Sequence, residues 1–224
     1  MQRKALKPNW ILASASPRRR EILEQLGISF SVDFSGIEEP PRKPRETPPR
    51  YAIRLARLKA EAIAPKYPSG HVLAADTIVV LGNRIFAKPK DRSEARSMLK
   101  SLSGRWYEVV TGICLLDCQT HSAYSSFCRS RVHFRRLSPV EIEWYLKLGE
   151  CRDKAGAYGA QGFASLFIDR IEGCYFNIVG FPVAVFEKLC RKAGISPILN
   201  SKFQIADGVK LSKSGSYNTL QLKK

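Results

Sequence analysis

The amino-acid sequence predicts an α/β fold, because segments typical of buried strands alternate with segments typical of amphipathic helices. Three observations lead to this prediction. Residues 10–27 have the pattern of a short strand, a small-residue turn and a helix. Residues 72–81 form the most apolar run, and residues 106–116 and 124–134 are rich in β-branched and aromatic side chains. The 224 residues suffice to bury a sizeable core.

The first strand–helix segment carries an unusual charge pattern. Ser16 suits the N-cap and Pro17 the first turn of a helix that Gly27 ends. Three consecutive arginines then crowd a helix start, where the dipole is already positive and favours carboxylates. Such a turn is either a solvated basic surface or, as we expect, a phosphate site built from backbone N–H groups, hydroxyls and guanidinium groups.

Two further segments place charge beside predicted buried structure. Residues 36–41 form a proline-stiffened turn that displays Glu38 and Glu39. A helix is predicted to begin after Thr47, and Lys59 lies four positions beyond Leu55, at the border of its apolar face. Lys59 is therefore either a snorkelling surface lysine or a cation directed into a site.

The most informative residue is Asp76, in the middle of the apolar run 72–81. An ionised carboxylate in such surroundings is costly unless it is paired, hydrogen-bonded or bound to a metal, which predicts a functional role. Gly82-Asn83 then predicts a two-residue hairpin, and Lys88 follows its second strand, adding a cation near the same place.

The remaining elements complete the predicted domain. Capping-box patterns predict helices that begin after Asp91 and after Ser138. We expect the last strands at residues 163–168 and 175–179, followed by a final helix over residues 181–194.

The domain is expected to span residues 1–200. Residues 201–224 are rich in Lys, Ser, Gly and Asn and lack an apolar period, so we expect a flexible basic tail outside the core.

Composition narrows the possible partners and compartment. The net charge of +17 favours attraction to polyanions, such as nucleotides, nucleic acid or anionic membrane surfaces. No apolar run approaches the ~20 residues that span a bilayer, and the N-terminal segment is too short in apolar residues for a signal peptide. The cysteines are scattered without C-x-x-C pairs, which favours free thiols in a reducing cytoplasm.

Seven short blocks of the sequence occur together, in this order, in one known family. They are ASASPRR (13–19), GIEE (36–39), RLKA (57–60), ADTIV (75–79), KPKD (88–91), LSG (102–104) and DKAGAYGAQG (153–162). Over about residues 9–190, the sequence thereby resembles the Maf family of nucleoside triphosphate pyrophosphatases. The Asp76-Thr77 pair and the sequence GAQG resemble the branch that acts on dTTP and UTP. The branch that acts on 7-methyl-GTP usually has glutamine after the aspartate.

The resemblance implies a fold and an activity. The implied fold is Maf/ITPase-like, with a mixed, strongly bent sheet flanked by helices and two lobes around a deep nucleotide-binding cleft. The implied reaction converts a nucleoside triphosphate to the monophosphate and pyrophosphate with a divalent metal, Mg or Mn. Family members are linked to house-cleaning of nucleotide pools and to arrest of cell division.

The resemblance also implies residue roles. Asp76 is the expected proton acceptor for the attacking water, and with Glu38 it is an expected metal ligand. Thr77 and Gln161 are expected to contact the pyrimidine. The expected phosphate clamp comprises Ser14, Arg18, Arg19, Lys59 and Lys88.

Two alternatives stay open at this point. One is a 7-methyl-GTP pyrophosphatase of the same family. The other is a basic nucleic-acid-binding module without catalysis, although the sequence lacks basic–aromatic interleaving and a recognisable DNA-reading helix. We expect a small-molecule nucleotide as the substrate, no membrane partner, and only non-specific nucleic-acid binding through the tail. A homodimer is left open.

Overall fold

The computed structural model describes residues 9–34, 36–197, 210–214 and 217–221. The main strands are β1 (Trp10–Leu12), β2 (Phe30–Val32), β3 (His71–Leu81), β4 (Arg84–Phe86), β5 (Trp106–Asp117), β6 (Ala123–Phe134) and β7 (Ile168–Glu172). The α-helices are α1 (Pro17–Gln25), α2 (Pro48–Ile63), α3 (Arg92–Leu102), α4 (Pro139–Leu148), α5 (Tyr175–Val179) and α6 (Val183–Lys192). Short 3₁₀ helices are η1 (Ala64–Lys66), η2 (Ala155–Ala157) and η3 (Phe163–Phe167).

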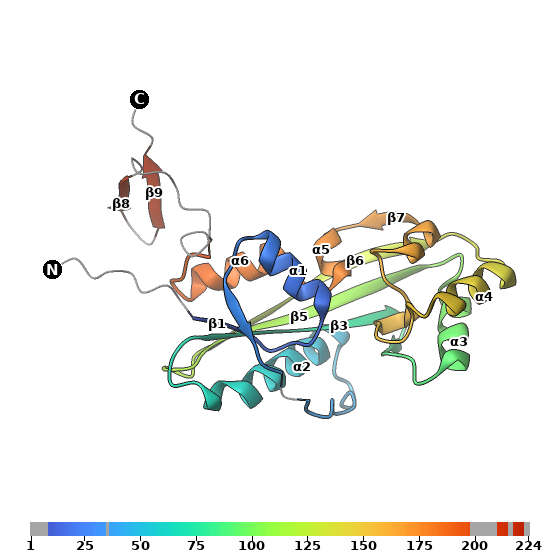
Figure 1. The fold of residues 1–224 in the computed structure, drawn as a ribbon, viewed down its shortest axis with the longest axis horizontal. Coiled ribbons are helices and arrows are strands. Elements are labelled where there is room, and N and C mark those ends of the chain that lie inside the picture. Colours follow the sequence, from blue (N-terminus) through green and yellow to red (C-terminus); the bar gives the residue numbers. More distant parts are fainter. Residues whose placement is uncertain (1–8, 35, 198–209, 215–216, 222–224) are drawn as a thin grey trace.

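These strands form one mixed sheet, which confirms the predicted α/β class. Its order is β2-β1-β3-β5-β6-β7, with β4 also paired to β3 (Figure 1). β1 runs parallel to both β2 and β3, while the pairs that link β3, β5, β6 and β7 are antiparallel. The Gly82-Asn83 hairpin is confirmed, since Leu81 pairs with Arg84.

One edge of β3 is left open in its middle. β1 pairs with residues 71–73 of β3, and β4 pairs with residues 79–81 at the same edge. No strand of the described chain pairs with residues 74–78 on this side. Asp76 and Thr77 lie in this gap, where a ligand can approach a strand from its side.

The two faces of β3 contribute to different cores. Ala75 belongs to the core that contains residues of α1 and α6, whereas Ala74 belongs to the core beneath α2. Because side chains alternate along a strand, Asp76 points to the α2 side and Thr77 to the α1 side. A third core joins α3 and α4 at the far end of the long strands (Figure 1).

Helix α2 lies unusually close to the sheet at Gly112 of β5. A Cβ atom at this position would lie 2.2 Å from the backbone carbon of Ala52 and 2.4 Å from the backbone nitrogen of Ile53. Only glycine permits this approach, and it holds α2, which carries Lys59 about two turns further on, against the sheet.

The helix starts are partly as predicted. Ser138 and Glu141 form the reciprocal capping box, and the carboxylate of Asp91 accepts a hydrogen bond from the Glu94 N–H. Ser16 occupies the N-cap of α1 without a side-chain capping bond. Its backbone N–H instead donates to Ser14 Oγ at 3.2 Å.

The prediction of strands at residues 163–168 and 175–179 is wrong. The first segment is mostly η3, with Ala164 and Phe167 buried at a spacing of three residues, and the strand β7 follows it. The second segment is α5, whose end is closed by the N–H of Gly180 at φ +111°. Short apolar runs fit a buried strand and a buried helical turn equally well, so periodicity alone could not separate them.

The C-terminal segment contains regular structure that was not predicted. β8 (Lys210–Ser214) and β9 (Tyr217–Gln221) pair antiparallel as a separate two-stranded sheet. The other positions of the predicted tail lie outside the described residues.

All six cysteines are free thiols, as expected. In the described part of the chain, we find no helix with the length and apolar character needed to cross a membrane.

Candidate active site

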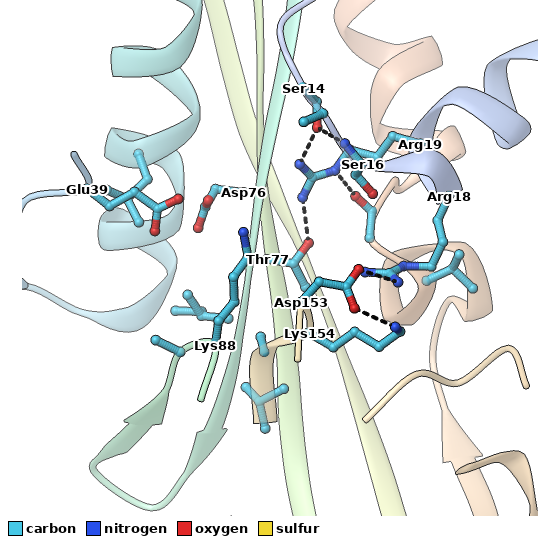
Figure 2. A pocket seen from close by; sticks show the side chains of 18 of the residues that line it. Ser14, Ser16, Arg18, Arg19, Glu39, Asp76, Thr77, Lys88, Asp153 and Lys154 are labelled. Carbon is cyan, nitrogen blue, oxygen red and sulfur yellow. Dashed lines mark hydrogen bonds and ion pairs between the residues drawn. The ribbon is translucent and has the colours of Figure 1, made fainter. Parts of the chain in front are cut away.

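A cavity of about 440 Å³ opens at the gap along β3. Its walls come from the β1–α1 turn, residues 36, 37 and 39, α2, β3, the segment after β4, the loop 153–160 and the end of α5. Most of the predicted site residues line it, and Figure 2 shows many of them around one space. The lining residues among them are Ser14, Arg18, Arg19, Lys59, Asp76, Thr77 and Lys88.

On one side of β3, Lys59 joins two carboxylates. Asp76 is only 5% exposed, and Lys59 Nζ donates to its Oδ1. The same Nζ donates to Glu39 Oε1 at 2.6 Å. Burial raises the pKa of Asp76; Lys59 opposes this rise, and the negative charge of Glu39 adds to it. Asp76 is therefore a carboxylate whose proton affinity is shifted toward neutral pH.

On the other side of β3, Arg19 joins three chain segments. Its Nε donates to the Gly180 carbonyl at 2.9 Å, Nη1 to Ser14 Oγ at 2.9 Å and Nη2 to Thr77 Oγ1 at 3.1 Å (Figure 2). Burial lowers the pKa of Arg19, and the nearby charge of Asp76 partly offsets this effect. Since a guanidinium has five N–H groups, two remain for a ligand.

The hydroxyl of Ser14 is left with its proton free. Ser14 Oγ accepts hydrogen bonds from Arg19 Nη1 and from the Ser16 N–H, at 2.9 and 3.2 Å. A hydroxyl has two acceptor positions, so both are filled and only the O–H group can face a ligand. Ser14 is therefore suited to donate a hydrogen bond to an anionic oxygen, as the predicted phosphate clamp requires.

Three more cations border the cavity, and two of them form ion pairs with a protein carboxylate. Arg18 forms an ion pair with Asp153 at 3.7 Å, and Lys154 forms one with the same carboxylate at 2.6 Å. Lys88 extends toward the space beside Asp76 (Figure 2). Within the described residues, its side chain makes no ion pair, so its charge is available to a ligand.

Two predicted site residues are not part of the cavity lining. Glu38 and Gln161 are both exposed, and neither contributes to the walls. Glu39 lines the cavity together with Gly36 and Ile37, whereas Glu38 does not. No regular strand or helix covers this segment, so no local sequence pattern distinguishes Glu39 from Glu38.

Asp153 and Lys154 are site residues that sequence reasoning did not select. Both line the cavity and lie in the seventh sequence block. Their adjacent opposite charges in a glycine-containing loop were the available signal.

The donor atoms present fit a divalent cation. In the described chain no group of three or more His, Cys, Asp or Glu side chains could hold a metal. The carboxylates of Asp76 and Glu39 nevertheless converge on one cationic group, the ammonium of Lys59. Mg²⁺ is commonly held by one or two carboxylates together with substrate phosphates and water, so this pair suffices when a phosphate ligand supplies further oxygens.

The raised pKa of Asp76 predicts a pH-dependent difference in stability. Between the pKa of Asp76 in the unfolded chain and its higher pKa in the folded protein, the folded state holds a proton that the unfolded state has released. Wild-type stability therefore falls as pH rises through this window. The amide of Asp76→Asn cannot bind this proton, so the melting temperature of the variant relative to wild type should increase as pH rises above about 4.

A matched control uses a carboxylate shifted in the opposite direction. Hydrogen bonds from Arg54 hold the pKa of Glu46 at about 2. Glu46→Gln should therefore lower the melting temperature by a constant amount between about pH 5.5 and about pH 7. For Asp76→Asn, a difference that stays constant or shrinks with rising pH would contradict the raised pKa.

Comparisons with known proteins identify the family of this chain. Residues 9–193 match the family described as Maf-like protein. The dTTP/UTP pyrophosphatase of Syntrophomonas wolfei is 46% identical over 182 residues, covering 81% of this chain and 96% of that protein. The protein of the same name from Deinococcus radiodurans is 44% identical, covering 84% of this chain and 95% of that protein. The one from Pyrococcus furiosus is 46% identical, covering 80% of this chain and 92% of that protein. A solved HAM1 protein from Coxiella burnetii shares 15% identity at a TM-score of 0.41, covering 58% of this chain and 74% of that one. The chain belongs to the Maf family.

Proposed function

We propose that this protein hydrolyses dTTP and UTP to the nucleoside monophosphate and pyrophosphate. The observation that carries the proposal is the buried Asp76 carboxylate, hydrogen-bonded by Lys59 in a cavity that also contains the free cation Lys88. The names of the similar proteins support the choice of substrate. The cavity between the α1–α2 end and the α3–α4 end of the sheet is the proposed nucleotide-binding cleft.

Asp76 acts as the proton acceptor in the proposed reaction. A water molecule attacks the α-phosphorus, the bond to the bridging α–β oxygen breaks, and that oxygen leaves with pyrophosphate. The proton of the water passes to Asp76, whose burial raises its pKa and makes it a better base. Lys59 holds the carboxylate in position while it is ionised.

The triphosphate is neutralised by the groups that keep free donors. Ser14 offers its O–H, Arg18 and Lys88 offer charge, and Arg19 offers its two remaining N–H groups. A divalent metal, Mg or Mn, would be held by Asp76 and Glu39, in preference to the exposed Glu38. When bound, such an ion neutralises charge on the phosphate oxygens.

The pyrimidine is assigned to the Thr77 side of the cavity. Thr77 lines the wall there, and Gln161 directly follows the lining residue Ala160, from which it would reach the base at the rim. The 7-methyl-GTP alternative is less favoured, because no similar protein named above carries that activity.

The nucleic-acid-binding alternative is also less favoured. Three arginines of the basic strand β6 and of the segment after it are paired with carboxylates. The pairs are Arg129–Glu108, Arg131–Glu172 and Arg135–Glu141, at 3.5, 2.6 and 2.7 Å. Much of the positive charge of this strand and of the segment after it is thus neutralised. A buried Asp76 carboxylate would also have no purpose in a module without catalysis. Non-specific nucleic-acid binding is assigned to the tail, residues 201–224. The proposed catalytic domain is residues 1–200, and its proposed location is the cytoplasm.

Asp76→Asn tests the proposed reaction. With UTP and Mg²⁺, wild-type protein should release UMP and pyrophosphate, while Asp76→Asn should lose about 10²–10⁴-fold in kcat, because the amide cannot accept a proton. Asp91→Asn, at the cap of α3 and outside the cavity, is the control and should keep its kcat. Near-normal turnover by the Asp76 variant would rule out this residue as the base.

A pair of neighbouring lysines tests the phosphate clamp. Lys88→Ala should lower kcat/KM by about tenfold or more without changing the melting temperature, because its partner is the ligand. Lys90 is exposed and lies outside the cavity lining, so Lys90→Ala carries the same charge change as a control. Equal losses in the two variants would show that only the overall charge matters.

A further inference from the structure

A second layer of hydrogen-bonding groups lies behind the cavity wall at Thr77. Thr111 of β5 is fully buried and pairs in register with Thr77 across the β3–β5 ladder. Their hydroxyl oxygens are 2.9 Å apart, and either could be the donor on distance alone. Thr111 Oγ1 also lies 3.0 Å from the carbonyl oxygen of Asn177.

The Asn177 carbonyl decides which threonine donates. A carbonyl oxygen only accepts, so the single hydroxyl proton of Thr111 is committed to Asn177. No proton remains on Thr111 for Thr77. In the hydrogen bond between the two threonines, Thr77 is therefore the donor and Thr111 the acceptor.

Arg19 fixes the rest of the Thr77 hydroxyl. A guanidinium only donates, so Thr77 Oγ1 accepts from Arg19 Nη2. With its proton given to Thr111 and one acceptor position filled by Arg19, Thr77 keeps one free acceptor position and no free proton. Toward the cavity, this hydroxyl can only accept a hydrogen bond.

The Asn177 carbonyl is itself held in place. Asn177 is fully buried, and its side-chain Nδ2 donates to the Val109 carbonyl and to Ser130 Oγ, each at 2.9 Å. Ser130 Oγ in turn bonds the backbone of Cys174 just before α5. These contacts prevent α5 from turning the carbonyl away, so the direction of the Thr77 hydroxyl is built into the core.

We propose that Thr111 is a specificity-determining positioning residue: it keeps Thr77 an acceptor, so that the site selects bases with an N–H donor. This inference rests on the proposed function. Uracil and thymine carry N3–H and satisfy such an acceptor. Cytosine presents an unprotonated N3, which would face Thr77 acceptor to acceptor and leave both groups unpaired.

The test compares kcat/KM for UTP and CTP in matched variants. Wild-type protein should prefer UTP. Thr111→Val keeps the shape but removes the acceptor, which frees the Thr77 proton for cytosine N3. The UTP/CTP ratio should therefore fall by about tenfold, as expected for one unpaired hydrogen-bonding group. Thr111→Ser keeps the hydroxyl and should restore the wild-type ratio.

Two further variants separate specificity from loosening of the core. Thr77→Val should lose the preference by itself, and Thr111→Val added to it should cause no further change in the ratio, because Thr111 acts only through Thr77. Leu189→Ala, in α6 and outside the cavity lining, loosens the core without touching the contacts that hold the Asn177 carbonyl, and should leave the UTP/CTP ratio unchanged. If Thr111→Val does not fold, Thr111→Ala, which removes the same hydroxyl with a smaller side chain, takes its place in both comparisons.

The outcomes that overturn the proposal differ from those that overturn the proposed function. An unchanged UTP/CTP ratio in Thr111→Val or in Thr77→Val would overturn the role of this pair. So would equal specificity constants for UTP and CTP in the wild type, with the pyrophosphatase activity itself intact. Absence of pyrophosphate release from every nucleotide would overturn the proposed function instead.

Discussion

The candidate site depends on one half-buried guanidinium, that of Arg19. Arg19 binds the turn after β1 through Ser14, the middle of β3 through Thr77 and the end of α5 through the Gly180 carbonyl. These segments are far apart in the chain, and the planar fork of arginine fixes all three in one geometry. The three arginines that crowd the start of α1 thus have separate surroundings: Arg18 pairs with Asp153, Arg19 turns inward and Arg20 is exposed. The positive charge of Arg18 and Arg19, which is unfavourable at the start of a helix, is therefore offset by carboxylate, hydroxyl and carbonyl groups of the protein itself.

The gap along β3 explains how the proposed proton acceptor and the proposed contacts to phosphate and base come to border one cavity. Adjacent residues of a strand face opposite sides of a sheet, and a fully paired strand would keep them apart. Because β1 and β4 leave residues 74–78 open, Asp76 and Thr77 both border the same cavity. In the proposed reaction, the α2 side supplies the proton acceptor, and the α1 side supplies the contacts to phosphate and base.

Sequence reasoning predicted those parts of the site that depend on local pattern. Asp76 stood out because a charge interrupted an apolar strand, and the placement of Lys59 beside the apolar face of its helix followed from helical periodicity. It selected Glu38 where Glu39 faces the cavity, because the direction of a side chain in an irregular segment depends on what the segment packs against. No local pattern contains the two long-range contacts of the site. The hydrogen bond of Arg19 to Gly180 follows from the packing of α5, and the position of Thr111 behind Thr77 follows from strand order. The α5 segment was mistaken for a strand for a related reason, since its helical turn is stabilised by contacts with β5 and β6.

Replacing Arg19 by lysine tests most directly whether this guanidinium organises the site. Arg19→Lys keeps the positive charge and a long stem, but a single ammonium cannot hold three acceptors in the geometry of the planar fork. The measurement is kcat/KM for UTP and for CTP in variant protein that still unfolds cooperatively on heating. If Arg19 positions Ser14, Thr77 and α5 together, both constants should fall by about 10²-fold or more, since misplacement of about 1 Å has that effect. Values within about threefold of wild type for both nucleotides would contradict the central role of this residue.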